Sequence, residues 1–302
     1  MKQARSLKRN LPLKLALGIL IGMSSNVVSY AIDSQGADIL DEILEHSDEE
    51  LARGREPVMI FDLDDTIFDA GSRTLAILKS LSVDQELRDD FSGLEQKLAN
   101  LVNNDIHYDL SDNLDMLAIT DKDLRDKASN YWNERFFLSC DLDAIHPRAK
   151  DFVLKSHAKG AHIVYLTGRD EPRMKDCTME SFRLNGLPVD ERTTLMLKPH
   201  KDLPDVEFKQ AAFKTIEQLG SVIAGFDNEP ANVNAMAQYF PRAEIVFIET
   251  RHSSRPDKPF PELEHLKWQV ARRYQDFKDV FYLFDRFGKT IRSTDYNFCW
   301  ER

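Results

Sequence analysis

The chain has 302 residues, of which 42% are hydrophobic and 30% are charged, a composition typical of a globular protein with a substantial core. Acidic residues outnumber basic ones by 51 to 40, which gives a net charge of −11, and no dense run of lysine and arginine follows residue 31. Because such a chain repels polyanions, we expect no nucleic acid partner.

The first 31 residues differ in character from the rest of the chain. Lys2 and Arg5 belong to a basic start, the apolar run "LALGILIGMSSNVV" follows, and Ser29 and Ala31 supply the small residues that a signal peptidase requires. This pattern predicts that residues 1–31 are a signal peptide and that the protein is exported, either periplasmic or secreted. An uncleaved membrane anchor is the alternative, although the apolar run is short for a full span. Cleavage would leave a mature chain with a net charge of −16.

The three cysteines, Cys140, Cys177 and Cys299, are scattered and odd in number. They form neither a disulfide framework nor a cluster of metal ligands. A single bridge, for example Cys140–Cys177, would suit an oxidising compartment, but the sequence leaves the pairing open.

Short apolar runs alternate with helical patterns in the expected mature domain, residues 32–302. The runs read as strands buried on both faces, and they cover residues 57–63, 161–167, 193–198, 221–227 and 243–249. The helical patterns, several bounded by proline or glycine, cover residues 148–160, 171–186, 206–220 and 230–240. This alternation predicts an α/β fold, a Rossmann-like parallel sheet flanked by helices.

The segment from about residue 70 to residue 144 is far longer than a crossover helix needs. Apolar residues at three- and four-residue spacing predict helices within residues 72–81, 84–102 and 121–137. We expect a helical cap inserted after the first strand, with a structural elaboration that has no role at the site as the alternative. A further helix is expected near the C-terminus, within residues 263–277.

Two aspartates follow the first strand in "FDLDDT" and are predicted to share a direction. Asp62 and Asp64 are two residues apart, so on an extended segment their side chains point the same way. A calcium-binding EF-hand loop would need a preceding helix, a glycine at the sixth position and a glutamate at the twelfth. Here a strand precedes, and Ile67 and Arg73 hold those two positions, which excludes an EF-hand.

Other polar side chains follow the later strands, whose carboxyl ends form the ligand crevice in such sheets. Thr167 and Gly168, in "YLTGRD", suit an oxyanion such as phosphate, although Thr-Gly turns are common. Asp227, in "GFDNEP", adds an oxygen ligand that together with Asp62 fits a sparse Mg²⁺ site. A positively charged side chain is also needed to balance the carboxylates and a bound phosphate. The candidates are Lys198, Lys209 and Lys214.

Taken together, these stretches resemble the haloacid dehalogenase (HAD) superfamily of phosphohydrolases over about residues 57–250. "FDLDDT" is similar to the first motif of the family, "YLTGR" to the second and "GFDNEP" to the acidic fourth. The stretch "LMLKPHKDLPDVEFK" is similar to the segment of polynucleotide-kinase-type phosphatase domains that ends in an essential lysine, which favours Lys209. The second downstream aspartate of the usual fourth motif is missing. A further metal contact, through Asn228 or Glu229, is therefore left open.

The resemblance implies a phosphatase mechanism and a role for each matched residue. Asp62 would be the nucleophile and form an aspartyl-phosphate, and Asp64 would be the general acid and base. Thr167, Gly168 and Lys209 would bind the phosphate of the substrate. The implied cofactor is Mg²⁺, held by Asp62, the backbone carbonyl of Asp64, and Asp227. The second aspartate of the first motif argues for phosphate chemistry rather than dehalogenation.

The sequence therefore predicts an exported, Mg²⁺-dependent phosphomonoesterase, resembling acid phosphatases, that acts on a small phosphorylated substrate. The alternatives are a non-catalytic phosphate- or metal-binding protein of the same fold, a phosphotransferase and a polynucleotide 3′-phosphatase. Membrane contact is expected only through an uncleaved signal segment. Arg73 and His107 are candidates for substrate contact but are expected at the surface, whereas Asp65 and Asp69 are expected to be structural.

Overall fold

The structure is a computed structural model that describes residues 34–268, 283–284 and 290–291. The expected signal peptide, Cys299 and most of the helix expected within residues 263–277 lie outside the described residues. Among the described helices, none combines the length and the apolar character that crossing a membrane requires.

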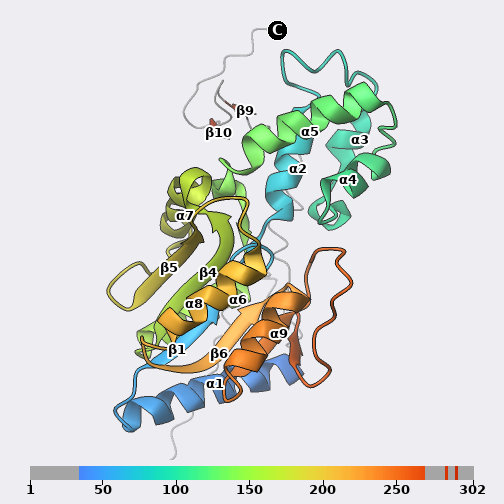
Figure 1. Cartoon of the computed structure of the whole chain (residues 1–302). Helices are drawn as coiled ribbons and strands as arrows, with labels where there is room; N and C mark the ends of the chain where they lie inside the picture. Colours follow the sequence, from blue (N-terminus) through green and yellow to red (C-terminus); the bar gives the residue numbers. More distant parts are fainter. Residues whose placement is uncertain (1–33, 269–282, 285–289, 292–302) are drawn as a thin grey trace, which may run out of the picture. The chain divides into compact units, whose positions relative to one another are not determined.

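A six-stranded parallel sheet forms the centre of the fold, with the strand order β5-β4-β1-β6-β7-β8 (Figure 1). Its strands are β1 (Pro57–Phe61), β4 (His162–Asp170), β5 (Thr193–Lys198), β6 (Ser221–Asp227), β7 (Glu244–Ile248) and β8 (Glu264–Leu266). Four of the five predicted apolar runs contain one of these strands in full, and the run 161–167 covers β4 except for its last three residues. The predicted α/β class with a parallel sheet is confirmed.

Helices cover both faces of the sheet. They are α1 (Ser34–Ala52), α6 (Pro147–Ala158), α7 (Glu171–Asn185), α8 (Asp205–Ile216) and α9 (Pro230–Tyr239). The bounds follow local chemistry, as α7 illustrates. The Asp170 carboxylate accepts a hydrogen bond from the backbone N–H of Arg173 at its start, and Gly186, with a φ of 65°, ends the helix.

The alternation of side chains along β1 divides the core into two layers. Met59 and Phe61 face one side of the sheet and pack with apolar residues of α1, α6 and α7. Val58 and Ile60 face the other side and pack with α8 and α9 (Figure 1). Because side chains alternate along a strand, β1 is buried on both faces and its apolar run is continuous.

A helical insert, residues 70–143, interrupts the chain between β1 and β4. Its ends are joined by the antiparallel pair β2 (Phe68–Asp69) and β3 (Ala144–Ile145). Between them lie α2 (Gly71–Ser80), α3 (Glu95–Asn100), α4 (Leu110–Met116) and α5 (Lys122–Phe136), with 3-10 turns at Asn103–Asp105 and Cys140–Leu142. The insert has an apolar core of its own, which includes Leu78, Phe91 and Leu98.

Two of the predicted helices need correction. The pattern at residues 84–102 forms only α3, because residues 85–93 form turns and Gly93, with a φ of 92°, leaves the helical conformation just before α3. At the C-terminal end, Glu264–Leu266 form β8 rather than the start of a helix, since they pair in parallel with β7. Helices α1 and α4 and the short pair β9 (Leu283–Phe284) and β10 (Thr290–Ile291) were not predicted.

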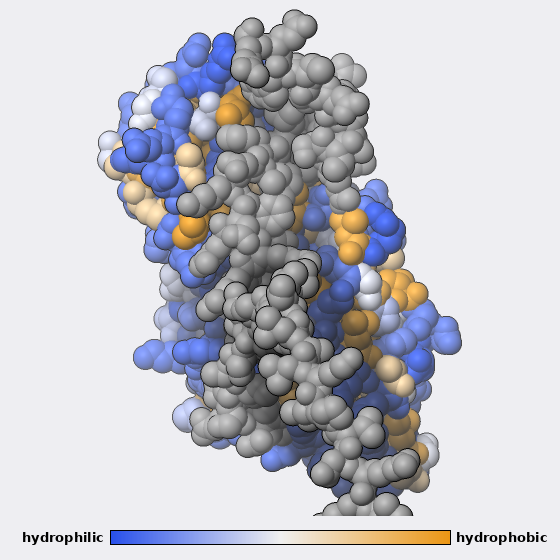
Figure 2. Space-filling view, turned by 180° about the vertical axis from the view of Figure 1, so that it is seen from behind, coloured by the Kyte–Doolittle hydropathy of each residue, from blue (hydrophilic) through white to orange (hydrophobic). Residues whose placement is uncertain are grey.

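The coloured part of the face seen in Figure 2 is mainly hydrophilic. Figure 2 shows scattered hydrophobic residues among hydrophilic ones over the coloured part of one face. The large hydrophobic side chains that are exposed, such as Val189 and Tyr239, lie singly along the sequence. Such isolated residues are ordinary for a globular surface.

Candidate active site

A cavity of about 510 Å³ lies where the carboxyl ends of the strands meet the helical insert. Five of the predicted site residues line it, namely Asp62, Asp64, Thr167, Gly168 and Lys209. Asp227, the sixth, is buried directly behind Lys209. The structure thus brings together residues that are up to 165 positions apart in the chain.

The ammonium group of Lys209 joins the two aspartates that were predicted to hold a metal. It donates hydrogen bonds to Asp62 Oδ1 at 2.7 Å and to Asp227 Oδ2 at 2.6 Å. All three side chains are buried. Of the three candidate lysines, only Lys209 makes this contact; Lys198 pairs with Asp205, and Lys214 is exposed on the outside of α8.

Asp62 lies in an environment that opposes its ionisation. Burial raises the pKa of this carboxyl above its usual range, and the positive charge of Lys209 only partly offsets that effect. The negative charge of Asp227 raises the Asp62 pKa further. Two buried carboxylates sharing one ammonium group leave one negative charge without a counterion.

This donor set fits a Mg²⁺ ion. The carboxylates of Asp62 and Asp227 are oxygen donors, and a divalent cation beside them would compensate the unbalanced charge. In the described part of the chain, no three His, Cys, Asp or Glu side chains cluster to form a complete protein cage for a metal. A cation here would therefore rely on few protein ligands, as Mg²⁺ commonly does, with water and phosphate oxygens completing its shell.

Asp64 is held by two arginines. Its Oδ1 accepts hydrogen bonds from Arg73 and Arg169, each at 2.7 Å, and its Oδ2 accepts a second bond from Arg169 at 2.9 Å. Burial alone raises the pKa of Asp64, but the charges of the two arginines outweigh it and lower that pKa well below the usual range. Asp64 is therefore ionised and fixed in direction.

The two arginines are held in turn by Asp143, a residue that was not predicted to belong to the site. Asp143, fully buried at the end of the insert, accepts hydrogen bonds from Arg73 at 2.7 Å and from Arg169 at 2.8 Å. The expectation of a surface position for Arg73 is wrong, because its side chain is completely buried within this ion network. His107, in contrast, is exposed and lines the cavity as expected of a surface candidate.

Thr167 and Gly168 occupy the loop-like end of β4. The pairing of β4 with β5 is interrupted between Leu166 and Asp170, so the backbone at Gly168 is not held in that ladder. A side chain at position 168 would collide with Asp205, since a Cβ there would lie 2.5 Å from Asp205 Oδ2. Only glycine fits this position without a shift of its neighbour. The space that a side chain would need here is occupied by the Asp205 carboxylate.

The other acidic residues of the first motif and of the fourth have partners of their own. Asp65 and Asp69 both pair with Arg251. Asn228 donates from Nδ2 to the backbone carbonyl of Arg251 at 2.5 Å, and Glu229 accepts two bonds from Ser253 at 2.7 Å. The side chains that could supply a further metal contact are thus already hydrogen-bonded.

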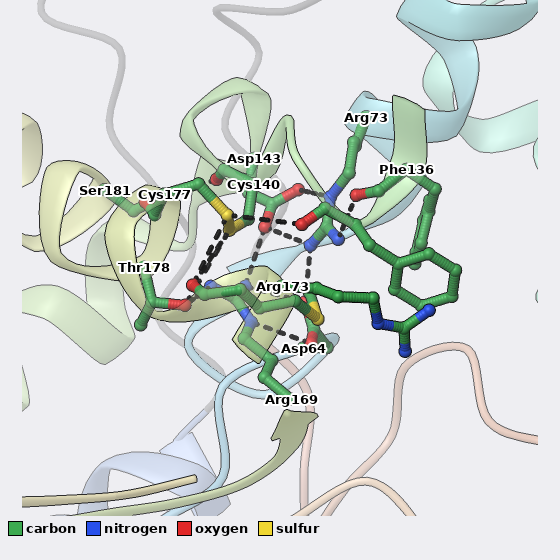
Figure 3. Close-up of a disulfide and its surroundings, with 12 residues drawn as sticks. Asp64, Arg73, Phe136, Cys140, Asp143, Arg169, Arg173, Cys177, Thr178 and Ser181 are labelled. Atoms are coloured by element: carbon green, nitrogen blue, oxygen red, sulfur yellow. Dashed lines mark hydrogen bonds and ion pairs between the residues drawn. A yellow bond between two sulfur atoms is a disulfide. The ribbon is translucent and has the colours of Figure 1, made fainter. Parts of the chain in front are cut away.

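A disulfide between Cys140 and Cys177 links the end of the insert to α7, with the two Cα atoms 5.3 Å apart. Figure 3 shows this bridge beside Asp143 and Arg169. The hydroxyl of Ser181 on α7 also donates to the carbonyl of Cys140 at 2.5 Å. The segment that carries Asp143 is therefore fastened to α7 both covalently and by hydrogen bonding.

No family model matches the chain, and no curated protein matches it either. Solved structures do show similarity. A HAD-superfamily hydrolase from Geobacter sulfurreducens is 13% identical over 70% of this chain and 91% of its own, with a TM-score of 0.44. A haloacid dehalogenase-like hydrolase from Streptococcus pneumoniae is 12% identical over 71% and 94%, with a TM-score of 0.40. A class C acid phosphatase from Bacillus anthracis is 17% identical over 66% and 65%, with a TM-score of 0.33.

Proposed function

We propose that this protein is a Mg²⁺-dependent phosphomonoesterase that acts through an aspartyl-phosphate on Asp62. The observation that carries the proposal is the Asp62–Lys209–Asp227 contact, buried at the mouth of a cavity that Asp64 and Thr167 also line. A buried carboxylate next to a cation and an oxyanion site is the arrangement that nucleophilic attack on phosphorus requires.

In this mechanism Asp62 attacks the phosphorus atom and displaces the alcohol of the ester. Lys209 keeps Asp62 in place and offsets the charge that accumulates around it. Thr167 and the backbone of Gly168 bind the phosphate oxygens. Mg²⁺ would be held by Asp62, the backbone carbonyl of Asp64, and Asp227, and when bound it neutralises charge on the phosphoryl group.

Asp64 transfers a proton in both half-reactions. As an ionised carboxylate held by Arg73 and Arg169, it is ready to accept a proton from the water that hydrolyses the aspartyl-phosphate. In the first half-reaction it must carry a proton to give to the leaving oxygen. A carboxyl group in this role is compatible with operation in acid.

Hydrolysis of p-nitrophenyl phosphate with Mg²⁺ or with EDTA tests the proposal. The Asp62→Asn variant keeps the size of the side chain but removes the nucleophile, so turnover should fall by at least about a thousandfold. Asp112→Asn, on the insert away from the cavity, is the matched control and should retain activity. Undiminished turnover in Asp62→Asn would overturn the mechanism. Phosphate binding without any turnover in the unaltered protein would favour the non-catalytic alternative.

We also propose that the protein is exported, as a periplasmic or secreted enzyme. The Cys140–Cys177 disulfide supports this proposal, since structural disulfides persist mainly in oxidising compartments. Fractionation of cells that produce the full chain should place the protein outside the cytoplasm with its first 31 residues removed. Recovery of the intact chain in the cytoplasm would contradict export.

A further inference from the structure

Three aromatic side chains at the end of α5 line the same cavity as Asp62 and Asp64. We call Trp132, Phe136 and Phe137 the aromatic wall. All three are only half-buried. The ring centroids of Trp132 and Phe136 lie 4.1 Å apart, and those of Phe136 and Phe137 lie 5.3 Å apart. The three rings thus form one contiguous aromatic cluster that lines the cavity.

Neighbouring polar groups fix the rings of the aromatic wall in place. The indole N–H of Trp132 donates to Thr74 Oγ1 at 3.3 Å. The guanidinium of Arg73 lies 4.2 Å from the Phe136 ring centre and donates to the Phe136 carbonyl at 3.0 Å. The guanidinium of Arg173 lies 3.6 Å from the Phe137 ring centre. Rings that are held before a ligand arrives lose little entropy on binding.

The wall lies on the side of the site where the leaving group must depart. Arg73 contacts Asp64 with its Nη2 atom and Phe136 with the face of its guanidinium (Figure 3). In the proposed mechanism, on which this inference rests, Asp64 gives its proton to the leaving oxygen. The group attached to that oxygen therefore lies next to the aromatic wall.

The charges that line the cavity argue against a second anionic group on the substrate. Of the six lysines and arginines among the described lining residues, five are already paired with carboxylates. These pairs are Arg169–Asp64, Arg173–Asp170, Lys198–Asp205, Lys209–Asp62 and Arg251–Asp65. A leaving group that is uncharged suits this lining better than one with a further phosphate.

We propose that the aromatic wall selects phosphomonoesters whose leaving group carries a flat, uncharged aromatic ring. Because the rings of Trp132 and Phe137 lie 6.2 Å apart at 74° to each other, such a ring stacks on one of them and contacts the other edge-on. A cavity of about 510 Å³ has room for a phosphate together with such a ring. Two kinds of leaving group carry such a ring, namely an alcohol with an aryl group and a nucleoside. The experiment distinguishes them.

Matched pairs of alkyl esters isolate the effect of the ring from the reactivity of the leaving group. Benzyl phosphate is compared with cyclohexylmethyl phosphate, and adenosine 5′-monophosphate with ribose 5-phosphate. In each pair the ester oxygen is bonded to a CH₂ group, and only one member has a flat ring. We expect kcat/KM to favour the aromatic member of at least one pair by about fivefold, the equivalent of about 1 kcal/mol of stacking. The pair with the larger ratio identifies the kind of leaving group.

Phe137→Leu and Trp132→Leu keep an apolar side chain but remove its flat face. In both variants the preference for the aromatic ester should fall by about threefold or more. Tyr239→Leu is the matched control, because Tyr239 is an exposed aromatic residue outside the cavity and should leave the ratio as it is. Phe137 does not belong to the core of the insert, so its variant is expected to fold even if Trp132→Leu does not.

The outcomes separate this inference from the function on which it rests. If both esters of each pair are hydrolysed with equal kcat/KM, the phosphatase stands and the inference is overturned. A preference that persists undiminished in both variants overturns the role of the aromatic wall. If none of the four esters nor p-nitrophenyl phosphate is hydrolysed, the proposed function itself fails.

Discussion

Arg73 and Asp143 pair in the interior of the protein although they belong to opposite ends of the helical insert. Arg73 Nε donates to Asp143 Oδ1 at 2.7 Å, and both side chains are fully buried. The same arginine holds Asp64 at 2.7 Å. The ion pair that closes the insert is thus also a support for the predicted acid and base of the site.

Removal of Asp143 should destabilise the protein strongly. In Asp143→Ala, Arg73 and Arg169 would remain buried with only Asp64 to balance them, and breaking a buried ion pair in this way costs about 3–5 kcal/mol. The free energy of unfolding in urea measures the loss. Asp126→Ala is the control, because Asp126 pairs with Lys122 on the surface and an exposed pair contributes about 0.2–1 kcal/mol. Equal losses in the two variants would contradict a supporting role for Asp143.

The three candidate lysines can be ranked by substitution. Lys209→Met should lower kcat/KM by about a hundredfold or more, since it removes the ammonium group that bridges Asp62 and Asp227. Lys214→Met, on the same helix but exposed, should change kcat/KM by less than about twofold. A larger effect at Lys214 than at Lys209 would show that the essential lysine has been misassigned.

Much of the fold could be predicted from local sequence patterns. The five strands follow from continuous apolar runs, and the strand ends place Asp62, Thr167 and Asp227 at one edge because all the strands are parallel. These inferences need only the period of the side chains and the direction of the strands. Such information is contained in a few neighbouring residues.

Contacts across the insert could not be predicted in the same way. Arg73 and Asp143 are 70 residues apart, and nothing in the residues around either one indicates the other. The disulfide shows the same limit, since three scattered cysteines allow several pairings. The segment before α3 shows a different limit, because the left-handed conformation of Gly93 interrupts a stretch whose apolar spacing is helical.

Magnesium should stabilise the folded protein as well as support turnover. A cation that binds beside Asp62 and Asp227 compensates their unbalanced charge, raises the free energy of unfolding by RT ln(1 + [Mg²⁺]/Kd) and thereby raises Tm. At a hundred times Kd the gain is about 2.7 kcal/mol. Differential scanning fluorimetry over a Mg²⁺ series measures the shift. Asp227→Asn should abolish most of it, and an equal shift in that variant would place the ion elsewhere.

The Cys140–Cys177 disulfide should stabilise the fold and keep Asp143 in place. The two cysteines are 37 residues apart. In the chain-entropy model, a disulfide that closes a loop of that length stabilises the folded state by about 3–4 kcal/mol. Cys177→Ser, or reduction with dithiothreitol, should therefore lower the urea midpoint. Cys299→Ser should not, and if it lowered the midpoint as much as Cys177→Ser, the assigned pairing would be wrong. Peptide mapping without reductant tests the bridge directly.

His146 should make the protein less stable as the pH falls. Its side chain is buried at the start of α6, and burial lowers its pKa to about 4 from an ordinary value of 6.5. The unfolded chain then binds more protons than the folded chain between pH 6.5 and pH 4. Stability contributed by neutral His146 is present above pH 6.5 and is lost progressively down to about pH 4, by up to about 3 kcal/mol.

The difference in free energy of unfolding between the unaltered protein and His146→Gln isolates this contribution, because glutamine does not titrate. Burial raises the pKa of Asp143 to about 6 despite its arginines. This shift makes the free energy of unfolding depend on pH with the sign opposite to that of His146. That dependence is present in both proteins and cancels in the difference. Urea unfolding at pH 7, 6, 5 and 4 should show the unaltered protein losing stability relative to His146→Gln at each step. A difference that stays constant with pH would show that the pKa of His146 is the same in the folded and unfolded chains, and that its burial does not limit stability in acid.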